Sequence, residues 1–359
     1  MIGPFVPQGC FVGVGLSSGG QKGYFSLNGV KITVLWGVFM KTIGVLTSGG
    51  DAPGMNAAVR SVVRTAIASG IKVMGIMRGY CGLIDGDICE LDIRSVSDII
   101  HRGGTILYSS RSPEFKTEEG MAKGIATCRR FGIEGIVVIG GDGSYRGARD
   151  LSLRGVPCVG IPGTIDNDIT STEYTIGYDT AMNTCTEMVD KLRDTTQSHF
   201  RCSVVEVMGR NAGYLALHTG IAVGATAIVV PEIPFDLKRD ILDRIDYTKS
   251  TGKRHFIIVV AEGVGKVDEL AKEIEDLTGI ESRATVLGHV QRGGSPSVRD
   301  RVMASVMGYE AVQLLKQGIG NRVIGFKDNK IVNYDIFEAL NMTKEFEFDT
   351  YKIAQTISI

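Results

Sequence analysis

The stretch IVVIGGDGS at residues 136–144 decides the fold class of this chain. It is a continuous apolar run that ends in a glycine-rich turn, and a stretch with helical spacing follows the turn. The same order of apolar run, glycine-rich turn and helical stretch recurs along the chain. Continuous apolar strands that alternate with helices are typical of parallel sheets covered on both faces. The sequence therefore predicts an α/β fold with mostly parallel sheets.

Working outward from this stretch, short apolar runs predict the strands, and the segments between them predict the helices. In such folds ligands bind beyond the carboxyl ends of the strands, so the loops that follow strands are the candidates for function. The predicted strands are 41–46, 132–139, 156–161, 203–207, 227–230, 256–260 and 322–326. The predicted helices are 55–69, 118–131, 178–195, 212–223, 236–250, 268–278 and 297–316.

Length and composition exclude several classes of protein. The chain has 359 residues and a net charge of -1, which suggests two domains and gives no basic excess for a nucleic-acid partner. Its 7 cysteines have no metal-binding or disulfide spacing, so they predict reduced thiols in a cytoplasmic protein. No apolar run reaches the ~20 residues of a membrane helix. We expect a soluble protein with neither nucleic acid nor membrane as a partner.

The first 39 residues differ from the rest of the chain. They contain Lys22 and Lys31 but no acidic residue, and an apolar run at 30–39 leads into Met40. A signal peptide has a basic start, an apolar middle and a small-residue cleavage site, and that order is not present here. We interpret Met40 as the start and residues 1–39 as an extension that is disordered or not native. A flexible tail or targeting segment is the alternative.

Two glycine-rich loops after predicted strands are suited to phosphate. Residues 47–56 open a helix, whose N-terminus favours an anion, although neither common phosphate fingerprint fits them and a plain turn is the alternative. Residues 140–144 place Asp142 among glycines after a buried strand. A carboxylate in that setting suits Mg²⁺ bridged to phosphate oxygens, whereas the alternative is an Asp that caps the next helix. Three glycines exceed what a cap requires, which favours the magnesium interpretation.

The loop at residues 162–168 carries two acids, Asp166 and Asp168, after another predicted strand. In phosphoryl transfer one acid can accept the proton of the attacking hydroxyl, and a second can orient metal-bound water. A turn with solvated acids is the alternative. Arginines also follow strands in glycine-rich settings, and their planar guanidinium groups suit phosphate. They are Arg111, Arg210, Arg283 and Arg292.

Together and in this order, these loops resemble the 6-phosphofructokinase family, in its bacterial ATP-dependent type. The likeness runs from Met40 to the C-terminal region. It implies two similar three-layer αβα domains, an ATP-binding domain (40–177 plus 291–341) and a domain for fructose 6-phosphate (178–290 plus 342–359), with the active site in the cleft between them. The matching residues are 47–56, 140–144, 162–168, 208–210, Glu262 and 283–295.

The resemblance also implies the roles of individual residues. Asp166 is the expected general base, with Arg111, Thr164 and Arg210 as further catalytic residues, and Mg²⁺ is expected on Asp142. Arg201 and Arg283 are expected from a neighbouring subunit, which implies a homotetramer. The expected ATP-binding residues are Gly50, Arg111, Ser112, Gly141, Asp142, Gly143 and Ser144. The expected substrate-binding residues are Thr164, Ile165, Asp166, Arg201, Met208, Gly209, Arg210, Glu262, Arg283, His289, Val290, Gln291 and Arg292.

A site for an allosteric effector, ADP or phosphoenolpyruvate, is a further implication of the resemblance. The family pattern has a basic residue at Ile93, an acid at Thr226 and a lysine at Thr251, so we expect an anion site with altered nucleotide preference or a weak response. The expected effector residues are Arg60, Arg64, Arg193, Gly224, Thr226, Lys253, Arg254 and His255.

Three other functions stay open as alternatives. Pyrophosphate-dependent relatives tend to carry Asp where this chain has Gly143 and Lys where it has Gly163, so the two glycines favour ATP as the phosphoryl donor. An NAD or lipid kinase would lack the block at 283–295. A catalytically silent regulatory subunit that only binds nucleotide would be expected to lose Asp142 or Asp166, and both are present.

Overall fold

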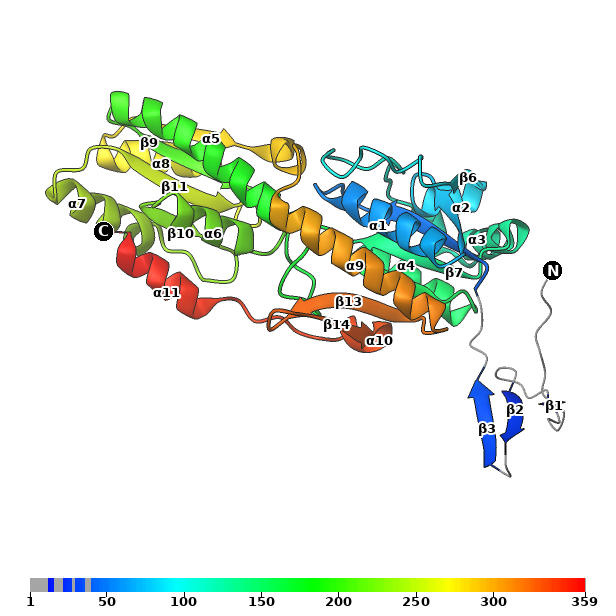
Figure 1. Ribbon diagram of the computed structural model, residues 1–359. Coiled ribbons are helices and arrows are strands. Elements are labelled where there is room, and N and C mark those ends of the chain that lie inside the picture. Colours follow the sequence, from blue (N-terminus) through cyan, green and yellow to red (C-terminus); the bar gives the residue numbers. More distant parts are fainter. Residues whose placement is uncertain (1–11, 16–21, 28–29, 36–39, 359) are drawn as a thin grey trace.

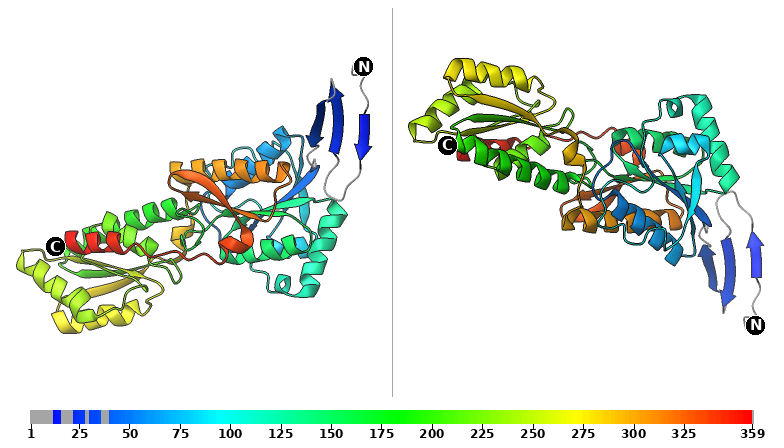
Figure 2. Two further views of the ribbon diagram at one scale, coloured as in Figure 1. Left: turned by 90° about the horizontal axis from the view of Figure 1, so that it is seen from below. Right: turned by 90° about the horizontal axis from the view of Figure 1, so that it is seen from above.

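The computed structural model describes residues 12–15, 22–27, 30–35 and 40–358. These residues contain a seven-stranded sheet, a four-stranded sheet and a three-stranded sheet. The two larger sheets lie in the two halves of an elongated molecule, each with helices packed around it (Figures 1 and 2). The α/β class with mostly parallel sheets, as the sequence predicted, is confirmed.

The seven-stranded sheet is parallel in its middle and antiparallel at its two edges. Apart from Thr42 at the start of β4, all residues of its three central strands are buried, because helices cover both faces. The strand order across the sheet is β14 (Lys330–Asp335), β13 (Arg322–Lys327), β8 (Cys158–Pro162), β7 (Gly135–Gly140), β4 (Thr42–Ser48), β5 (Lys72–Ile76) and β6 (Ile88–Leu91).

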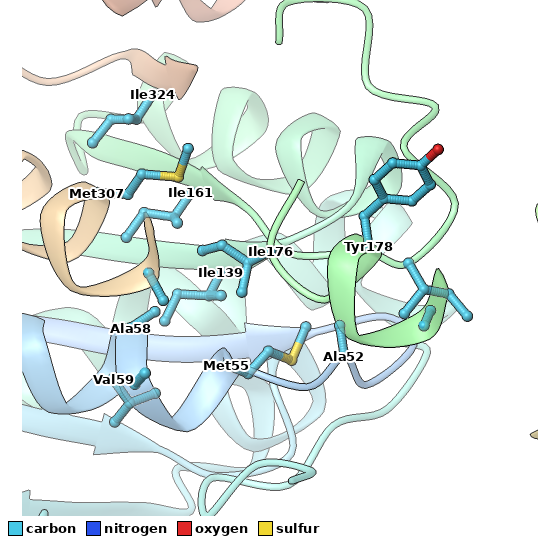
Figure 3. Close-up of a cluster of buried hydrophobic side chains, with 14 of the residues drawn as sticks. Ala52, Met55, Ala58, Val59, Ile139, Ile161, Ile176, Tyr178, Met307 and Ile324 are labelled. Carbon is cyan, nitrogen blue, oxygen red and sulfur yellow. The ribbon is translucent and has the colours of Figure 1, made fainter. Parts of the chain in front are cut away.

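Alternate residues of β7 enter the two cores on either side of this sheet. Ile139 packs with α1 (Met55–Ala68) and α9 (Val298–Lys316), as Figure 3 shows for Met55, Ala58 and Met307. Ile136 and Val138 belong to the other core, which contains residues of four helices. These helices are α2 (Tyr80–Asp85), α3 (Glu118–Phe131), α4 (Asp142–Leu153) and α10 (Ile336–Ala339).

The crossing of α1 and α9 depends on one glycine. A Cβ at Gly308 would lie 2.7 Å from the Cβ of Ser61 and 2.9 Å from the carbonyl oxygen of Ala58. Real Cβ atoms do not approach neighbours this closely, so a larger residue would push the two helices apart.

The four-stranded sheet is parallel throughout, with a core on each of its two faces. One face packs against α5 (Tyr178–Ser198), α6 (Tyr214–Ala222) and α11 (Phe348–Ile357), and the other against α7 (Asp243–Ser250) and α8 (Val267–Thr278). The strand order is β10 (Ala227–Val229), β11 (Phe256–Ala261), β9 (Cys202–Val207) and β12 (Ser282–Val286).

The chain passes between the two larger sheets three times. It leaves the seven-stranded sheet after β8 to form α5, returns after β12 to form α9, and leaves again after α10 (Ile336–Ala339) to form α11. Repeated crossing explains why no linker-like segment is found in the sequence. It also places loops from both sheets in the same region between them.

Most predicted helices and strands are present, with shifts of a few residues at their ends. The strands β5, β6, β12 and β14 were not predicted. β6, β12 and β14 are edge strands with polar residues, and β5 begins with Lys72 and contains Gly75, so none forms a continuous apolar run. The block at 283–295 contains most of β12 and a 3₁₀ turn, Gly288–Arg292.

Within residues 1–39 the structure contains a three-stranded antiparallel sheet. Its strands are β1 (Val12–Gly15), β2 (Lys22–Leu27) and β3 (Val30–Leu35). From its sequence this segment was expected to be disordered or not native, whereas these three strands form a sheet. The sequence of β3 alternates apolar residues with Lys31 and Thr33. This alternation indicates a strand, but none was predicted here from the sequence.

Within the described ranges, no helix combines the length and the apolar character that crossing a membrane requires.

Candidate active site

The loop after β8 carries the two acids that the sequence indicated. The loop is closed by hydrogen bonds from the N–H of Thr164 to the carbonyl of Ile176 (3.1 Å) and from the N–H of Ile176 to the carbonyl of Pro162 (2.9 Å). Between the acids, Asn167 has a φ of 51°, a left-handed conformation that Asn adopts more readily than most residues. The loop is thus a tight, internally bonded structure rather than a solvated turn.

Asp166 is a buried acid, with 3% of its surface exposed. Its Oδ2 accepts a hydrogen bond from the hydroxyl of Thr164 (3.1 Å), while its Oδ1 is buried without a hydrogen-bond partner. Burial, and then the neighbouring charge of Asp168, raises the pKa of Asp166 to about 6, against the opposing effect of Arg292. A carboxylate with one unpaired oxygen and a raised pKa is suited to accept a proton from a ligand.

Asp168 and Asp142 line one cavity of about 270 Å³, together with Arg210. Arg210 forms an ion pair with Asp168, at 3.4 Å between Nη1 and Oδ2, and Arg146 pairs with Asp142 at 3.0 Å. Burial raises the pKa of Asp168, and the negative charge of Asp142 adds to this effect. The cavity therefore brings together two carboxylates from the ends of neighbouring strands.

The carboxylates of Asp142 and Asp168 suit Mg²⁺ that is also bound by water and phosphate. They are too few to hold a metal ion by protein side chains alone. Among the described residues there is no group of three or more His, Cys, Asp or Glu side chains that could hold a metal ion. Magnesium, however, is usually bound by one or two carboxylates together with water and substrate phosphates. Asp142 and Asp168 meet that requirement.

The glycine-rich turn after β7 leads directly into the N-terminus of α4. Its N-cap is Gly141, and no side chain caps the helix, so the alternative that Asp142 is a capping residue was wrong. The turn lies against the acidic loop, since the N–H of Gly163 donates to the carbonyl of Gly140 at 3.0 Å. A Cβ at Gly143 would have no atom within 4 Å. Uncapped N–H groups beside open space form a favourable site for an anion.

The loop after β4 lies next to the segment that carries Arg111 and Ser112. The hydroxyl of Ser109 donates to the carbonyl of Gly49 at 2.6 Å, and Arg292 donates to the carbonyl of Asp51 at 3.1 Å. A Cβ at Gly50 would lie 2.7 Å from a guanidinium nitrogen of Arg292. Glycine at position 50 therefore allows this arginine to lie over the loop.

The four-stranded sheet contributes the segment Met208–Arg210 and Glu262, which follow the neighbouring strands β9 and β11. The N–H of Arg210 donates to the Glu262 carboxylate, which ties the two strand ends together. Gln291 is fully buried and accepts a hydrogen bond from the N–H of Met208 at 3.0 Å. Its amide nitrogen donates to the carbonyl of Gly288. Both polar atoms of the Gln291 side chain therefore bond within the protein.

Other expected substrate residues differ in exposure. Ile165 is fully buried and Thr164 is nearly so, whereas Val290 and His289 are exposed. Arg201 and Arg283 are not brought to Asp166, because they lie at the amino ends of β9 and β12, the ends opposite Met208. Both pair with Glu281, at 2.7 Å and 2.6 Å.

The expected effector residues form two groups within this chain. Arg60 and Arg64 lie one turn apart on α1, and burial followed by the charge of Arg64 lowers the pKa of Arg60. Arg193 belongs to α5 in the other half, where its charge, after burial, lowers the pKa of Lys253. The remaining members of this second group are Gly224, Thr226, Arg254 and His255, of which Thr226 is buried with an unpaired hydroxyl.

Sequence reasoning missed Lys344. Its ammonium group donates to the carbonyl of Asn167 at 2.7 Å, although the two residues are far apart in the chain. A lysine among mixed polar residues near the C-terminus carries no signal in the sequence that would single it out.

Fold and site together define an α/β enzyme that handles phosphate groups at the carboxyl ends of parallel strands. A family model described as Phosphofructokinase matches residues 42–315. The chain belongs to the phosphofructokinase family.

Individual relatives agree with this assignment. The chain is 57% identical over 319 residues to a protein of Clostridium tetani named ATP-dependent 6-phosphofructokinase, covering 89% of this chain and 100% of the relative. A protein of the same name from Bacillus thuringiensis is 56% identical over 320 residues, with the same two coverages, 89% and 100%. The solved structure of phosphofructokinase from Saccharomyces cerevisiae has a TM-score of 0.80 and is 35% identical, covering 89% of this chain and 48% of that one.

Proposed function

We propose that this chain is an ATP-dependent 6-phosphofructokinase. It transfers the γ-phosphoryl group of ATP to the 1-hydroxyl of fructose 6-phosphate and forms fructose 1,6-bisphosphate, a step of glycolysis. The observation that carries the proposal is the unpaired Oδ1 of Asp166, on a loop that bonds through the N–H of Gly163 to the turn before the uncapped N-terminus of α4. A proton acceptor and an anion site thus lie on neighbouring loops, as phosphoryl transfer to a hydroxyl requires.

In this proposal the glycine-rich loops hold the nucleotide. The loops at 47–56 and 140–144 both lead into helix N-termini, and the open space at Gly143 leaves room for phosphate oxygens. When bound, Mg²⁺ on Asp142 would neutralise phosphate charge. The proposed ATP residues remain Gly50, Arg111, Ser112, Gly141, Asp142, Gly143 and Ser144.

Asp166 then accepts the proton of the sugar 1-hydroxyl as that oxygen attacks the γ-phosphorus. Thr164 keeps the carboxylate in place through its hydroxyl, and Arg210 carries positive charge at the cavity where phosphate charge develops. Glu262, which accepts the N–H of Arg210, orients the segment that faces the sugar. The proposed 6-phosphate residues are Arg201, Arg283, His289 and Arg292.

The test is product formation by the purified chain with fructose 6-phosphate and Mg²⁺, with ATP and pyrophosphate compared as donors. We expect fructose 1,6-bisphosphate with ATP and none above background with pyrophosphate. Product with pyrophosphate alone would overturn the choice of donor, and absence of product with both would overturn the proposed reaction.

We also propose that the enzyme acts as a homotetramer. In one chain Arg201 and Arg283 lie at the far end of their sheet from Met208, so they reach a sugar phosphate only from a neighbouring copy. An apolar stripe on one face of α9 supports an interface. It consists of Val298, Val302, Val306 and Tyr309, which are 79%, 53%, 39% and 49% exposed.

The substitution Val302→Glu tests the interface. A charge in the middle of the α9 stripe is expected to convert tetramers into smaller species, because an unpaired buried charge opposes association. Sedimentation velocity of the variant and of Lys316→Glu, a charge change at the end of the same helix, measures the effect. A Val302→Glu variant with the mass of the unaltered protein would exclude this stripe as an interface.

For the effector we propose an anion site between copies, with Arg60 and Arg64 from one and Arg193 and Lys253 from another. Burial and then Arg64 lower the pKa of Arg60, and burial and then Arg193 lower the pKa of Lys253, which supports an anionic occupant such as ADP or phosphoenolpyruvate. Fully buried Thr226, in the place of an acid, supports an altered nucleotide preference.

A further inference from the structure

Lys344 lies on the segment between α10 and α11, the third crossing between the two larger sheets. Its Nζ is 2.7 Å from the carbonyl oxygen of Asn167, the residue between the two acids of the active-site loop. The same ammonium group lies 4.6 Å from the centre of the Tyr214 ring. One side chain thus connects the C-terminal segment to the acidic loop and to α6.

The surroundings of Lys344 hold its ammonium group in one place. Burial lowers the pKa of Lys344 to about 8, although the carboxylates of Glu347, Asp168 and Glu173 oppose the shift. Lysine at the surface is free to move, whereas a half-buried ammonium group needs its partners. The Asn167 carbonyl and the Tyr214 ring are the partners in contact with it.

Lys344 contacts the acidic loop at Asn167, a residue with an uncommon backbone conformation. Asn167 has its left-handed φ of 51°, and its side chain donates to the carbonyl of Glu173 at 3.2 Å. The hydrogen bond from Lys344 fixes the orientation of the peptide that follows Asn167, which leads into Asp168. A cavity of about 430 Å³ adjoins this contact and is lined by Asp168, Arg210 and Lys344.

We propose that Lys344 is a positioning residue for phosphoryl transfer, which holds the Asp166–Asp168 loop in its reactive conformation through the Asn167 carbonyl. The proposal rests on the proposed function. Lys344 acts through the backbone, so its loss displaces the acids without removing a group that binds the nucleotide. Small displacements of reacting groups lower the rate of the chemical step more than they weaken ground-state binding.

The experiment replaces Lys344 by Met, which keeps the length of the chain and removes its charge and donors. We expect kcat to fall ~10-fold with little change in the KM for ATP, since a misplaced general base affects the transition state. Lys344→Arg retains a cationic donor and is expected to recover most of kcat. Lys352→Met, an exposed lysine on α11, is the matched control and is expected to behave like the unaltered protein.

The hydrogen-exchange rate of the peptide that contains residues 165–170 is a second measurement, which reports on the loop and does not depend on activity. Faster exchange in Lys344→Met, with a normal melting temperature and with recovery in Lys344→Arg, is the expected result. An unaltered kcat, a matched rise in KM, or unaltered exchange would each overturn the proposal. If Lys344→Met fails to fold, Lys344→Gln is measured in its place and judged by the same results. An unaltered protein that does not phosphorylate fructose 6-phosphate would instead reject the proposed function, while the exchange result would still judge the contact.

Discussion

Replacement of Asp166 by Asn is expected to lower kcat by ~10²–10⁴-fold, the usual scale for loss of a general base. Asn has the shape of Asp and can still accept the hydroxyl of Thr164, but its amide cannot take the proton of the attacking hydroxyl. Because burial and the charge of Asp168 raise the pKa of Asp166 to about 6, the rate of the unaltered enzyme should also fall as the pH falls through about 6.

The same substitution is expected to stabilise the fold. The pKa of Asp166 is about 6 in the folded chain, against 3.8, the ordinary value of Asp, in the unfolded chain. The folded state therefore binds more protons between these two pH values. Stability is therefore lost as the pH rises from about 4 to about 6, by about 3 kcal/mol for a shift of about two pH units. Asp166→Asn removes this loss, and its melting temperature at pH 7 should rise.

Steady-state kinetics across pH 5–9 and thermal melting at pH 4 and pH 7 check both expectations. Asp349→Asn, which changes an acid that is 97% exposed on α11, is the control and should leave kcat and stability unaltered. Mass spectrometry must exclude deamidation of the variant back to Asp. A kcat within a few-fold of the unaltered enzyme would show that Asp166 is not the proton acceptor.

The structural features that could be predicted are those determined by residues close together in the sequence. The run of apolar residues at 136–139 needs both faces covered, which predicts a buried parallel strand and a turn at its carboxyl end, where ligands bind in such folds. Glycine at 143 and an acid at 166 could be placed in loops at strand ends for the same reason. They follow strands directly, so the strand pattern gives their place in the fold.

Features that depend on distant parts of the chain could not be predicted. Gln291 is buried and bonded to Met208, a contact that requires the return of the chain from β12. Glu281 pairs with Arg201 of the neighbouring strand end, and Lys344 reaches Asn167 across the third crossing. Spacing within a segment carries no information about such contacts. Only the fold of the whole chain brings these residues together.

Replacement of Gly143 by Asp is expected to lower kcat/KM for ATP by ~10²–10³-fold. In the free protein the new side chain fits, because a Cβ at this position meets no atom within 4 Å. Its carboxylate would instead occupy the space proposed for phosphate oxygens, next to Asp142. Two like charges ~4 Å apart repel by about 4 kcal/mol at an effective dielectric constant of ~20, which sets the expected size of the loss.

Stability should not fall with activity in this variant. Position 143 lies in the first turn of α4, where an acidic side chain is favoured by the helix dipole. Gly143→Asn has nearly the same size without the charge, so the pair of variants separates repulsion of phosphate from simple filling of space. Melting temperatures and kcat/KM for ATP at saturating fructose 6-phosphate are the measurements.

The Gly143→Asp variant is not expected to use pyrophosphate as a phosphoryl donor. The second position at which pyrophosphate-dependent relatives are expected to differ is Gly163, where there is no room for a larger side chain. A Cβ at Gly163 would lie 3.2 Å from Ile139 and 3.2 Å from Met55, both in the core, so a lysine there requires the core to shift. If Gly143→Asp kept ATP activity within a few-fold, the phosphates could not lie at the start of α4. If Gly143→Asn lost as much as Gly143→Asp, the space at residue 143 rather than its charge would select the donor.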